Sequence, residues 1–365
     1  MPLVTVSAFL VGPPLFVRQG DHYYSRPSYP CDSRCPFRSL SVARCPLPRC
    51  PQDMLINLLP DFFAVLESTD RVAAYQRYYA AHRRVLEAYW HNYVVDPEGP
   101  HFMDVVQGTV DAARADLRAM LARIDVVALA RGAEERCARL IEPDVDVDTV
   151  LMVGVGAANA GELVVAGRAA AFVCLEHFTG IANPDTQGLG LEPELIPLWL
   201  AHEITHGVRY TSPTSRSDLR QLIAGSEGYY SYWETGRQAS LRELLINEGL
   251  AVRVSQAVSP GHAAWEYFGY ERRQHARVRE LEPIIARTIA PDLDRAGLGL
   301  RLRYPSGGIS DEGRTVDRYV LPERAGYYYG ARMVEPAIEQ RGFAWAVRAS
   351  AAEITAIAET AAATA

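Results

Sequence analysis

The chain has 365 residues, of which 48% are hydrophobic and 22% charged, the composition of an ordinary globular protein with enough material for a sizeable core. Its 37 basic and 44 acidic residues give a formal net charge of −7. Proteins that bind nucleic acid normally have a basic balance or patch, so this charge argues against nucleic acid as a partner. No run of 18 apolar residues occurs in the sequence, so we expect no membrane-spanning helix and no membrane partner.

Residues 1–53 differ in character from the rest of the chain. They are rich in Pro, Arg, Ser and Cys and have no helical or strand periodicity, which predicts a disordered segment. Four of the six cysteines fall here with the spacing C-x3-C-x9-C-x4-C, which lacks the paired knuckles of zinc ribbons and favours a disordered tail over a structural zinc site. The N-terminal apolar stretch lacks a basic flank and is interrupted by Gly12-Pro13-Pro14. We therefore expect no secretory signal and a cytoplasmic protein.

Residues 54–145 are predicted to form a helical N-terminal region. An aromatic stripe at helical spacing extends from Thr69 to Tyr93, and two further helices are expected near 103–123 and 127–141. The stripe is typical of a helix that packs against other helices rather than of a cofactor site. His82 lies on it and is interpreted as a core or edge histidine.

Residues 146–365 begin with three short apolar runs, at 148–156, 162–165 and 169–175. Bounded by Gly and Asn, they predict a small antiparallel sheet. Gly154, Gly156 and Gly161 do not have the G-x-G-x-x-G spacing of a dinucleotide-binding loop, because the third glycine is one position too far. Helices are expected near 194–208, 240–257, 262–290, 324–341 and 350–362, with a mobile loop over 302–320. The predicted fold class is α+β and mostly helical.

The segment LIPLWLAHEITHGVRY contains an H-E-x-x-H motif at residues 202–206. Positions i and i+4 lie on one face of a helix, so His202 and His206 can reach one metal ion. Glu203 then stands beside the metal, where it can take a proton from water. The upstream turns are strongly apolar, and polar groups on a buried helix are costly unless something binds them. We therefore predict a zinc site with His202 and His206 as ligands and Glu203 as general base.

The third ligand is predicted on a later helix. The metzincin continuation requires Gly at position 209 and His at 212, and the chain has Arg209 and Ser212 there. The segment SLRELLINEGLAVRVSQAV begins with a capping box, Ser240 to Glu243, that fixes the helical phase and accounts for Glu243. In that phase Glu248 follows the apolar stripe and points inward. The alternative is that Glu248 lies at the helix edge in a surface salt bridge.

The pairing of HEITH with INEGLAV resembles gluzincin metallopeptidases, the group that includes thermolysin and the leukotriene-hydrolase-type aminopeptidases. It resembles more closely a bacterial family of predicted zinc-dependent proteases that carries a domain of unknown function. The hairpin strands before the motif and the segment PERAGYYYG at 322–330 extend this resemblance over roughly residues 140–350. It implies a zincin-like catalytic domain over 146–365, one zinc ion, and the ligands His202, His206 and Glu248.

The same resemblance implies an oxyanion donor, which gluzincins supply from a tyrosine or histidine. Tyr328 or Tyr327 is the expected donor, although core packing explains at least one of them equally well. His177, at the end of a predicted strand, is interpreted as a surface or supporting histidine rather than a ligand. Thermolysin-type enzymes place an acidic residue four positions after the third ligand, and this chain has Val252 there. The groups that orient the imidazoles are therefore not identified by the sequence.

Three functions remain open at this point. The first is a zinc hydrolase that cleaves amide bonds in a peptide or small amide substrate. The second is the same site acting on a non-peptide amide or ester. The third is a zinc-bearing protein that binds peptides, or has a regulatory role, without turnover.

Overall fold

The computed structural model describes residues 55–307 and 311–364, which belong to one compact unit. The predicted disorder of residues 1–53 and the interpretation of their cysteines lie outside the described residues. Helices predominate over strands, so the predicted α+β, mostly helical class is confirmed. None of the helices within the described ranges has the length and apolar character needed to cross a membrane.

A four-stranded sheet contains the strands predicted before the H-E-x-x-H motif. Its order is β1-β2-β4-β3, with the bounds β1 (Leu55–Asn57), β2 (Val147–Met152), β3 (Ala160–Val165) and β4 (Arg168–Cys174). β1 is parallel to β2 and β2 is parallel to β4, whereas β3 is antiparallel to β4. The expected antiparallel sheet is therefore wrong in part, because only the β3–β4 hairpin is antiparallel.

The physical reason lies in burial and in the hairpin turn. β2 is buried on both faces, as is nearly all of β4, which is typical of parallel strands covered on both sides. Ala166 and Gly167 join β3 to β4 with φ of 51° and 76°, the positive values of a two-residue hairpin turn. This turn pairs β3 with β4, and β3 occupies the edge of the sheet.

Six helices lie between β1 and β2 in the sequence. They are α1 (Leu59–Glu67), α2 (Arg71–Ala81), α3 (Arg83–Tyr93), α4 (Phe102–Asp111), α5 (Ala115–Leu121) and α6 (Val126–Ile141). The aromatic stripe is divided between α2 and α3 at His82, and the helix expected over 103–123 is divided between α4 and α5. Because β1 pairs with β2, and Trp90 and Phe172 share one core, the regions on either side of residue 145 fold together.

Most of the chain after the sheet is helical. The helices are α7 (Ile196–Thr211), α8 (Asp218–Gly225), α9 (Tyr232–Gln238), α10 (Leu241–Val258), α11 (Arg272–Glu280), α12 (Glu282–Ile289), α13 (Leu298–Arg303), α14 (Asp311–Arg314), α15 (Ala325–Arg341), α16 (Phe343–Arg348) and α17 (Ala351–Thr364). Two small hairpins join β5 (Ala182–Asn183) to β6 (Gly188–Leu189) and β7 (Thr315–Val316) to β8 (Tyr319–Val320). The 3-10 turns are η1 (Leu175–His177), η2 (Pro193–Leu195), η3 (Glu266–Phe268) and η4 (Ala290–Asp292).

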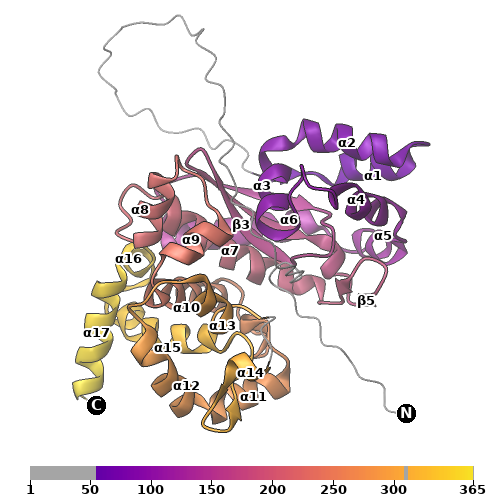
Figure 1. Ribbon diagram of the computed structural model, residues 1–365. Coiled ribbons are helices and arrows are strands. Elements are labelled where there is room, and N and C mark those ends of the chain that lie inside the picture. The colour runs from indigo at the N-terminus through magenta and orange to yellow at the C-terminus, as the bar shows by residue number, and fades with distance from the viewer. Residues whose placement is uncertain (1–54, 308–310, 365) are drawn as a thin grey trace, which may run out of the picture. The chain divides into compact units, whose positions relative to one another are not determined.

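α7 is the most deeply enclosed helix of the site region. Every residue from Ile196 to Tyr210 is buried, and its neighbours are β3 and β4, α6 and α10 (Figure 1). α10 lies in turn between α7 and α15. A helix surrounded in this way is normally apolar on all sides, so its polar side chains require partners or ligands.

Candidate metal centre

Two histidines one turn apart lie on the face of α7 that meets α10. His202 and His206 are each 2% exposed, and their ring centroids are 4.8 Å apart. α10 begins at Ser240, whose hydroxyl oxygen accepts the backbone N–H of Glu243 at 3.2 Å, so the predicted cap forms. Two turns further on, Glu248 Oε2 lies 3.2 Å from His202 Nε2 and 3.5 Å from His206 Nε2. The structure thus brings the three predicted ligands together.

The spacing of these donor atoms fits a zinc ion. Zinc holds nitrogen and oxygen ligands at about 2.0–2.1 Å, which places neighbouring ligand atoms about 3.3 Å apart in a tetrahedron. The separations of 3.2 Å and 3.5 Å match that value. All three donor atoms lie within 4.8 Å of one another. Two imidazoles and one carboxylate are also a donor set of catalytic zinc sites, which keep a fourth position open.

The protonation tendencies of two of the three groups agree with this assignment. Burial lowers the pKa of His202 despite its hydrogen bond to Glu248. Burial acts the same way on His206, but the Glu248 carboxylate outweighs it and the pKa of His206 is raised. Burial raises the pKa of Glu248, yet the two histidines outweigh it and hold that pKa well below its usual range. The anionic form of Glu248 and the neutral form of His202 are those that bind a metal, whereas the raised pKa of His206 favours an imidazolium that would have to lose its proton to do so.

Aromatic rings orient the imidazoles. The Nδ1 atoms of His202 and His206 have no hydrogen-bond partner within residues 55–307 and 311–364. Tyr210 stacks on His206 with centroids 5.8 Å apart and an interplanar angle of 15°, and Tyr327 stacks on His202 at 6.0 Å and 13°. Position 252, acidic in thermolysin-type enzymes, holds a fully buried valine. Stacking, together with a side-chain contact from Asn247 to His206, thus stands where metal-binding histidines commonly have a carboxylate partner.

Glu203 lies beside a second carboxyl group that the sequence analysis missed. Glu203 is 5% exposed, and its pKa is raised well above the usual range by burial, then by Glu162 and Glu248. Glu162 comes from β3, and it accepts hydrogen bonds from the hydroxyls of Tyr93 at 2.9 Å and Tyr210 at 3.2 Å. The signal in the sequence is one glutamate within the apolar strand segment AGELVV. Strand pairing and burial were needed to place it next to Glu203.

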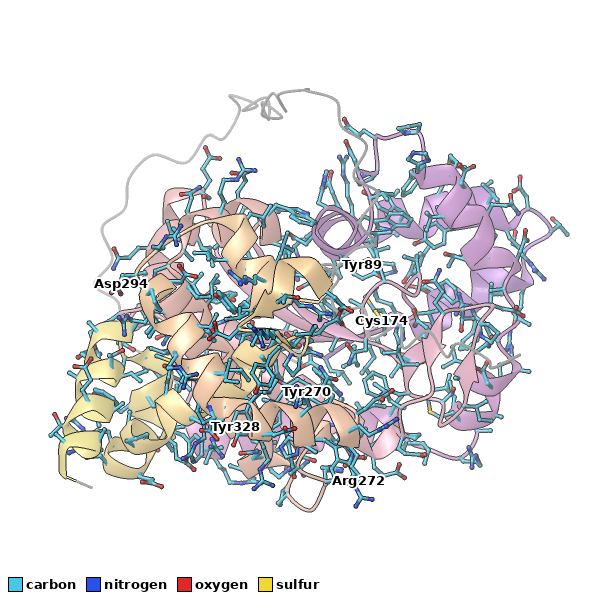
Figure 2. The ribbon with its side chains drawn as sticks, turned by 60° about the horizontal axis from the view of Figure 1, so that its bottom comes forward. Tyr89, Cys174, Tyr270, Arg272, Asp294 and Tyr328 are labelled. Carbon is cyan, nitrogen blue, oxygen red and sulfur yellow. The ribbon has the colours of Figure 1, made fainter. Side chains whose placement is uncertain are left out.

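The two candidate tyrosines have separate environments. Tyr327 is 7% exposed and lines the space in front of His202, Glu203 and Glu248. The Tyr328 hydroxyl instead donates to Glu282 at 3.2 Å. Its ring packs against Phe268, and Figure 2 shows it away from the sheet. Of the two expected oxyanion donors, the structure brings only Tyr327 to the site.

Close backbone contact places Tyr327 there. A Cβ atom at Gly249 would collide with the backbone of Gly330, and one at Gly330 would collide with the Leu245 carbonyl. α10 and α15 therefore touch at a point where no side chain fits. Glu248 immediately precedes Gly249, and Tyr327 lies one turn before Gly330. The contact therefore sets the position of the tyrosine relative to the third ligand.

Other polar residues considered in the sequence lie outside this centre. His177 is 2% exposed beside Glu176, and His82 contacts Asp61 at 2.7 Å. Glu243 joins the cap through its backbone N–H, but the cap does not account for its side chain, contrary to the sequence interpretation. Its fully buried carboxylate accepts hydrogen bonds from Arg209 at 2.7 Å and from the hydroxyl of Ser217 at 2.6 Å.

Comparison of the chain with protein-family models, curated proteins and solved structures gives no match. The functional argument therefore depends on the residues and geometry of this site.

Proposed function

We propose that the protein is a zinc-dependent hydrolase of amide bonds, with a zincin-like catalytic domain of the gluzincin type. The observation that carries this proposal is the convergence of His202, His206 and Glu248 at the spacing of zinc ligands. The buried carboxyl group of Glu203 next to them distinguishes a catalytic arrangement from a purely structural zinc site, which closes all four positions with protein ligands.

Glu203 is the general base in this proposal. A zinc ion held by the three ligands would act as a Lewis acid and lower the pKa of a water molecule towards neutrality. Glu203 follows the first ligand on α7, so its carboxylate takes the proton of that attacking water and then delivers it to the leaving nitrogen. Glu162 borders Glu203 and its hydrogen bonds to Tyr93 and Tyr210 hold this side of the site in place.

Tyr327 is the oxyanion donor in this proposal. Its ring stacks on His202, and Tyr327 lines the same cavity as Glu203 and Glu248. A preorganised hydroxyl donor stabilises the negative charge that develops on the carbonyl oxygen as water attacks. Glu203 thus serves both the attacking water and the leaving nitrogen, and Tyr327 serves the carbonyl oxygen.

The edge of β3 favours a short substrate. Peptides commonly bind by adding a strand to a free sheet edge. Here the Tyr93 hydroxyl accepts the N–H of Glu162 at 3.1 Å and donates to its carbonyl at 3.0 Å, and the N–H of Tyr230 donates to the Val164 carbonyl at 3.0 Å. Backbone groups of Glu162 and Val164 on the free edge of β3 are therefore already hydrogen-bonded within the protein. This supports a short peptide or small amide, including a non-peptide amide, over a long extended polypeptide.

Metal content and hydrolysis test the proposal together. Purified protein is assayed against casein, short fluorogenic peptides and acyl amides, before and after removal of metal with a chelator. We expect about one zinc per chain, hydrolysis of the short substrates, loss of hydrolysis with the chelator and recovery on adding zinc. Protein without zinc would contradict the metal site. Zinc-loaded protein that binds these substrates without cleaving any would support the binding function instead.

A further inference from the structure

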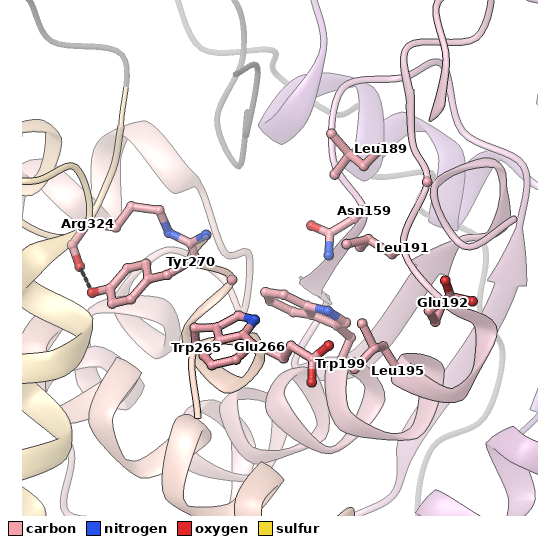
Figure 3. A pocket seen from close by; sticks show the side chains of 12 residues that line it. Asn159, Leu189, Leu191, Glu192, Leu195, Trp199, Trp265, Glu266, Tyr270 and Arg324 are labelled. Atoms are coloured by element: carbon pink, nitrogen blue, oxygen red, sulfur yellow. Dashed lines mark hydrogen bonds between the residues drawn. The ribbon is translucent and has the colours of Figure 1, made fainter. Parts of the chain in front are cut away.

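A second cavity of about 200 Å³ adjoins the candidate metal centre. Its walls include the aromatic side chains of Trp199, Trp265 and Tyr270 (Figure 3). Trp199 belongs to both spaces, because it lies one turn before His202 on α7 with the two ring centroids 5.7 Å apart. A molecule in this cavity therefore contacts the tryptophan that packs against His202.

Arg324 brings a positive charge to this cavity and forms no salt bridge within the described residues, although the Tyr327 side chain and the Glu248 carboxylate raise its pKa against the effect of burial. Its side chain is 3% exposed, and its Nε and Nη2 atoms have no hydrogen-bond partner in the described part of the chain. Figure 3 shows the guanidinium group turned toward the cavity. A buried guanidinium with two unused donors is costly, whereas a carboxylate can satisfy two such donors at once through a bidentate contact.

The backbone around Arg324 holds the residue in place. Arg324 has φ of 55° at the start of α15, and its carbonyl oxygen accepts the Tyr270 hydroxyl at 2.5 Å. Its guanidinium carbon lies 4.2 Å from the ring centroid of Tyr327, the proposed oxyanion donor. At Gly269 a Cβ atom would lie 2.7 Å from Arg324 Nη1 and 3.0 Å from the Trp199 ring. Glycine at 269 therefore leaves the space that the guanidinium occupies.

The remaining polar groups divide the cavity into two ends. Asn159 Oδ1 and Trp199 Nε1 also lack partners within the described ranges, so an acceptor and a donor are available beside the aromatic walls. The carboxylates of Glu192 and Glu266 lie away from Arg324, and that of Glu266 already accepts the backbone N–H of Ala263 at 2.6 Å. These acidic groups disfavour a ligand with a second negative charge near the aromatic walls.

We propose that this cavity is a carboxylate-recognising substrate subsite, in which Arg324 pairs with one carboxylate and Trp199 and Trp265 cover an apolar or aromatic body. Its link to turnover rests on the proposed hydrolase function, but the binding itself does not. The carboxylate comes from a peptide C-terminus or from an acidic side chain.

Three probes distinguish these sources. N-acetylphenylalanine presents a terminal carboxylate, N-acetylphenylalaninamide is its neutral counterpart, and N-acetyl-aspartyl-phenylalaninamide presents a side-chain carboxylate. Binding to the full chain is measured by calorimetry and by the fluorescence of the tryptophans. We expect at least one of the two acids to bind on the order of tenfold tighter than the neutral amide, because a charge-assisted bidentate contact is lost in the amide. Equal binding of all three would overturn the proposal.

Two variants and a matched control complete the test. Arg324→Gln should remove the preference for the acids, whereas Trp265→Ala should weaken all three probes and keep the preference. Arg114→Gln is the control, because Arg114 is also buried with two unpartnered nitrogens but is not part of this cavity. A preference that survives in folded Arg324→Gln protein contradicts the proposal.

If Arg324→Gln does not fold, Leu189→Glu takes its place. Leu189 is a half-buried residue of the cavity wall, and a negative charge there should lower the affinity for the acids more than for the amide. Equal losses for acid and amide would overturn the proposal. Zinc content and hydrolysis are recorded separately, so failure of the hydrolase function and failure of the subsite give different results.

Discussion

Two polar clusters lie between α7 and α10, and they differ in what completes them. Arg209 on α7 pairs with Glu243 on α10 at 2.7 Å, and both side chains are fully buried. The guanidinium also donates to the carbonyls of Val347 and Ala349 at 3.0 Å and 2.8 Å. One to two turns away, His202 and His206 on α7 face Glu248 on α10, and their donor atoms converge on one point.

The charges of the first cluster pair with each other within the protein, although Arg209 Nε and Glu243 Oε2 have no hydrogen-bond partner in the described residues, whereas we propose that a metal ion completes the second cluster. Arg209 and Glu243 meet each other and the backbone, which is the arrangement expected of a structural ion pair. At the second cluster three atoms that could bind a metal lie close together, with the Glu203 carboxyl group beside them and next to Glu162. The same helix pair thus provides both an internal support and a reactive site, and substitutions should separate these two roles.

The largest expected effect is on the ligands. His202→Ala, His206→Ala or Glu248→Ala should abolish zinc binding and hydrolysis, because two remaining ligands hold zinc poorly. Plasma emission measures the zinc in each purified variant. Full zinc occupancy in either histidine variant would contradict the proposed metal centre. Full occupancy in Glu248→Ala would mean that another residue is the third ligand.

Glu203→Gln should lower turnover on the order of 10²–10⁴-fold while zinc stays bound. Glutamine keeps the size of the side chain but cannot accept a proton at neutral pH. Steady-state kinetics on a short substrate should place the loss in kcat rather than in binding. Loss of zinc in this variant would show that Glu203 contributes to metal binding, contrary to the proposed site. Unchanged hydrolysis would mean that another group transfers the proton.

Arg209→Met should act on stability and leave the metal centre in place. Removing one partner leaves the Glu243 carboxylate buried and unpaired, which costs about 3–5 kcal/mol of the free energy of unfolding. Denaturant unfolding of the zinc-loaded protein measures this change, and zinc content is determined on the folded fraction. If Arg209→Met loses zinc while its stability is unchanged, the Arg209–Glu243 pair does not have the purely structural role that we assign to it.

Tyr327→Phe should lower kcat on the order of 10²–10³-fold, with zinc retained, because one oxyanion donor is removed. Tyr328→Phe is the matched control, since the two tyrosines are adjacent on α15 and only Tyr327 faces the site. Its kcat should be unchanged. If both variants or neither lose activity, Tyr327 is not the oxyanion donor.

The parts of the site that the sequence predicts are those carried by one helix each. A fixed period places His202 and His206 on one face of α7, and the Ser240 cap sets the phase that turns Glu248 inward. What could not be predicted depends on contacts between distant elements. Glu162 becomes relevant only because β3 lies beside α7, and the choice of Tyr327 over Tyr328 depends on where α15 crosses α10.

The sheet was also predicted only in part, for the same reason. Short apolar runs and turn residues located β2, β3 and β4, but strand direction is a property of pairing partners and not of a single strand. The environments of the buried arginines could not be predicted from the sequence either. Nothing local distinguishes Arg324, which meets an aromatic cavity, from Arg209, which meets Glu243.

The contact between Gly249 and Gly330 has a consequence for motion. Because the two backbones touch there, α15 cannot slide along α10 without a collision, and the pair moves as one body. Tyr327 and Glu248 are on that body, whereas both histidines are on α7. Any opening of the site is then a displacement of α7 relative to the α10–α15 pair. Such a displacement would change the distances from the histidines to Glu248 and Tyr327 together, so metal affinity and oxyanion stabilisation would rise and fall in step.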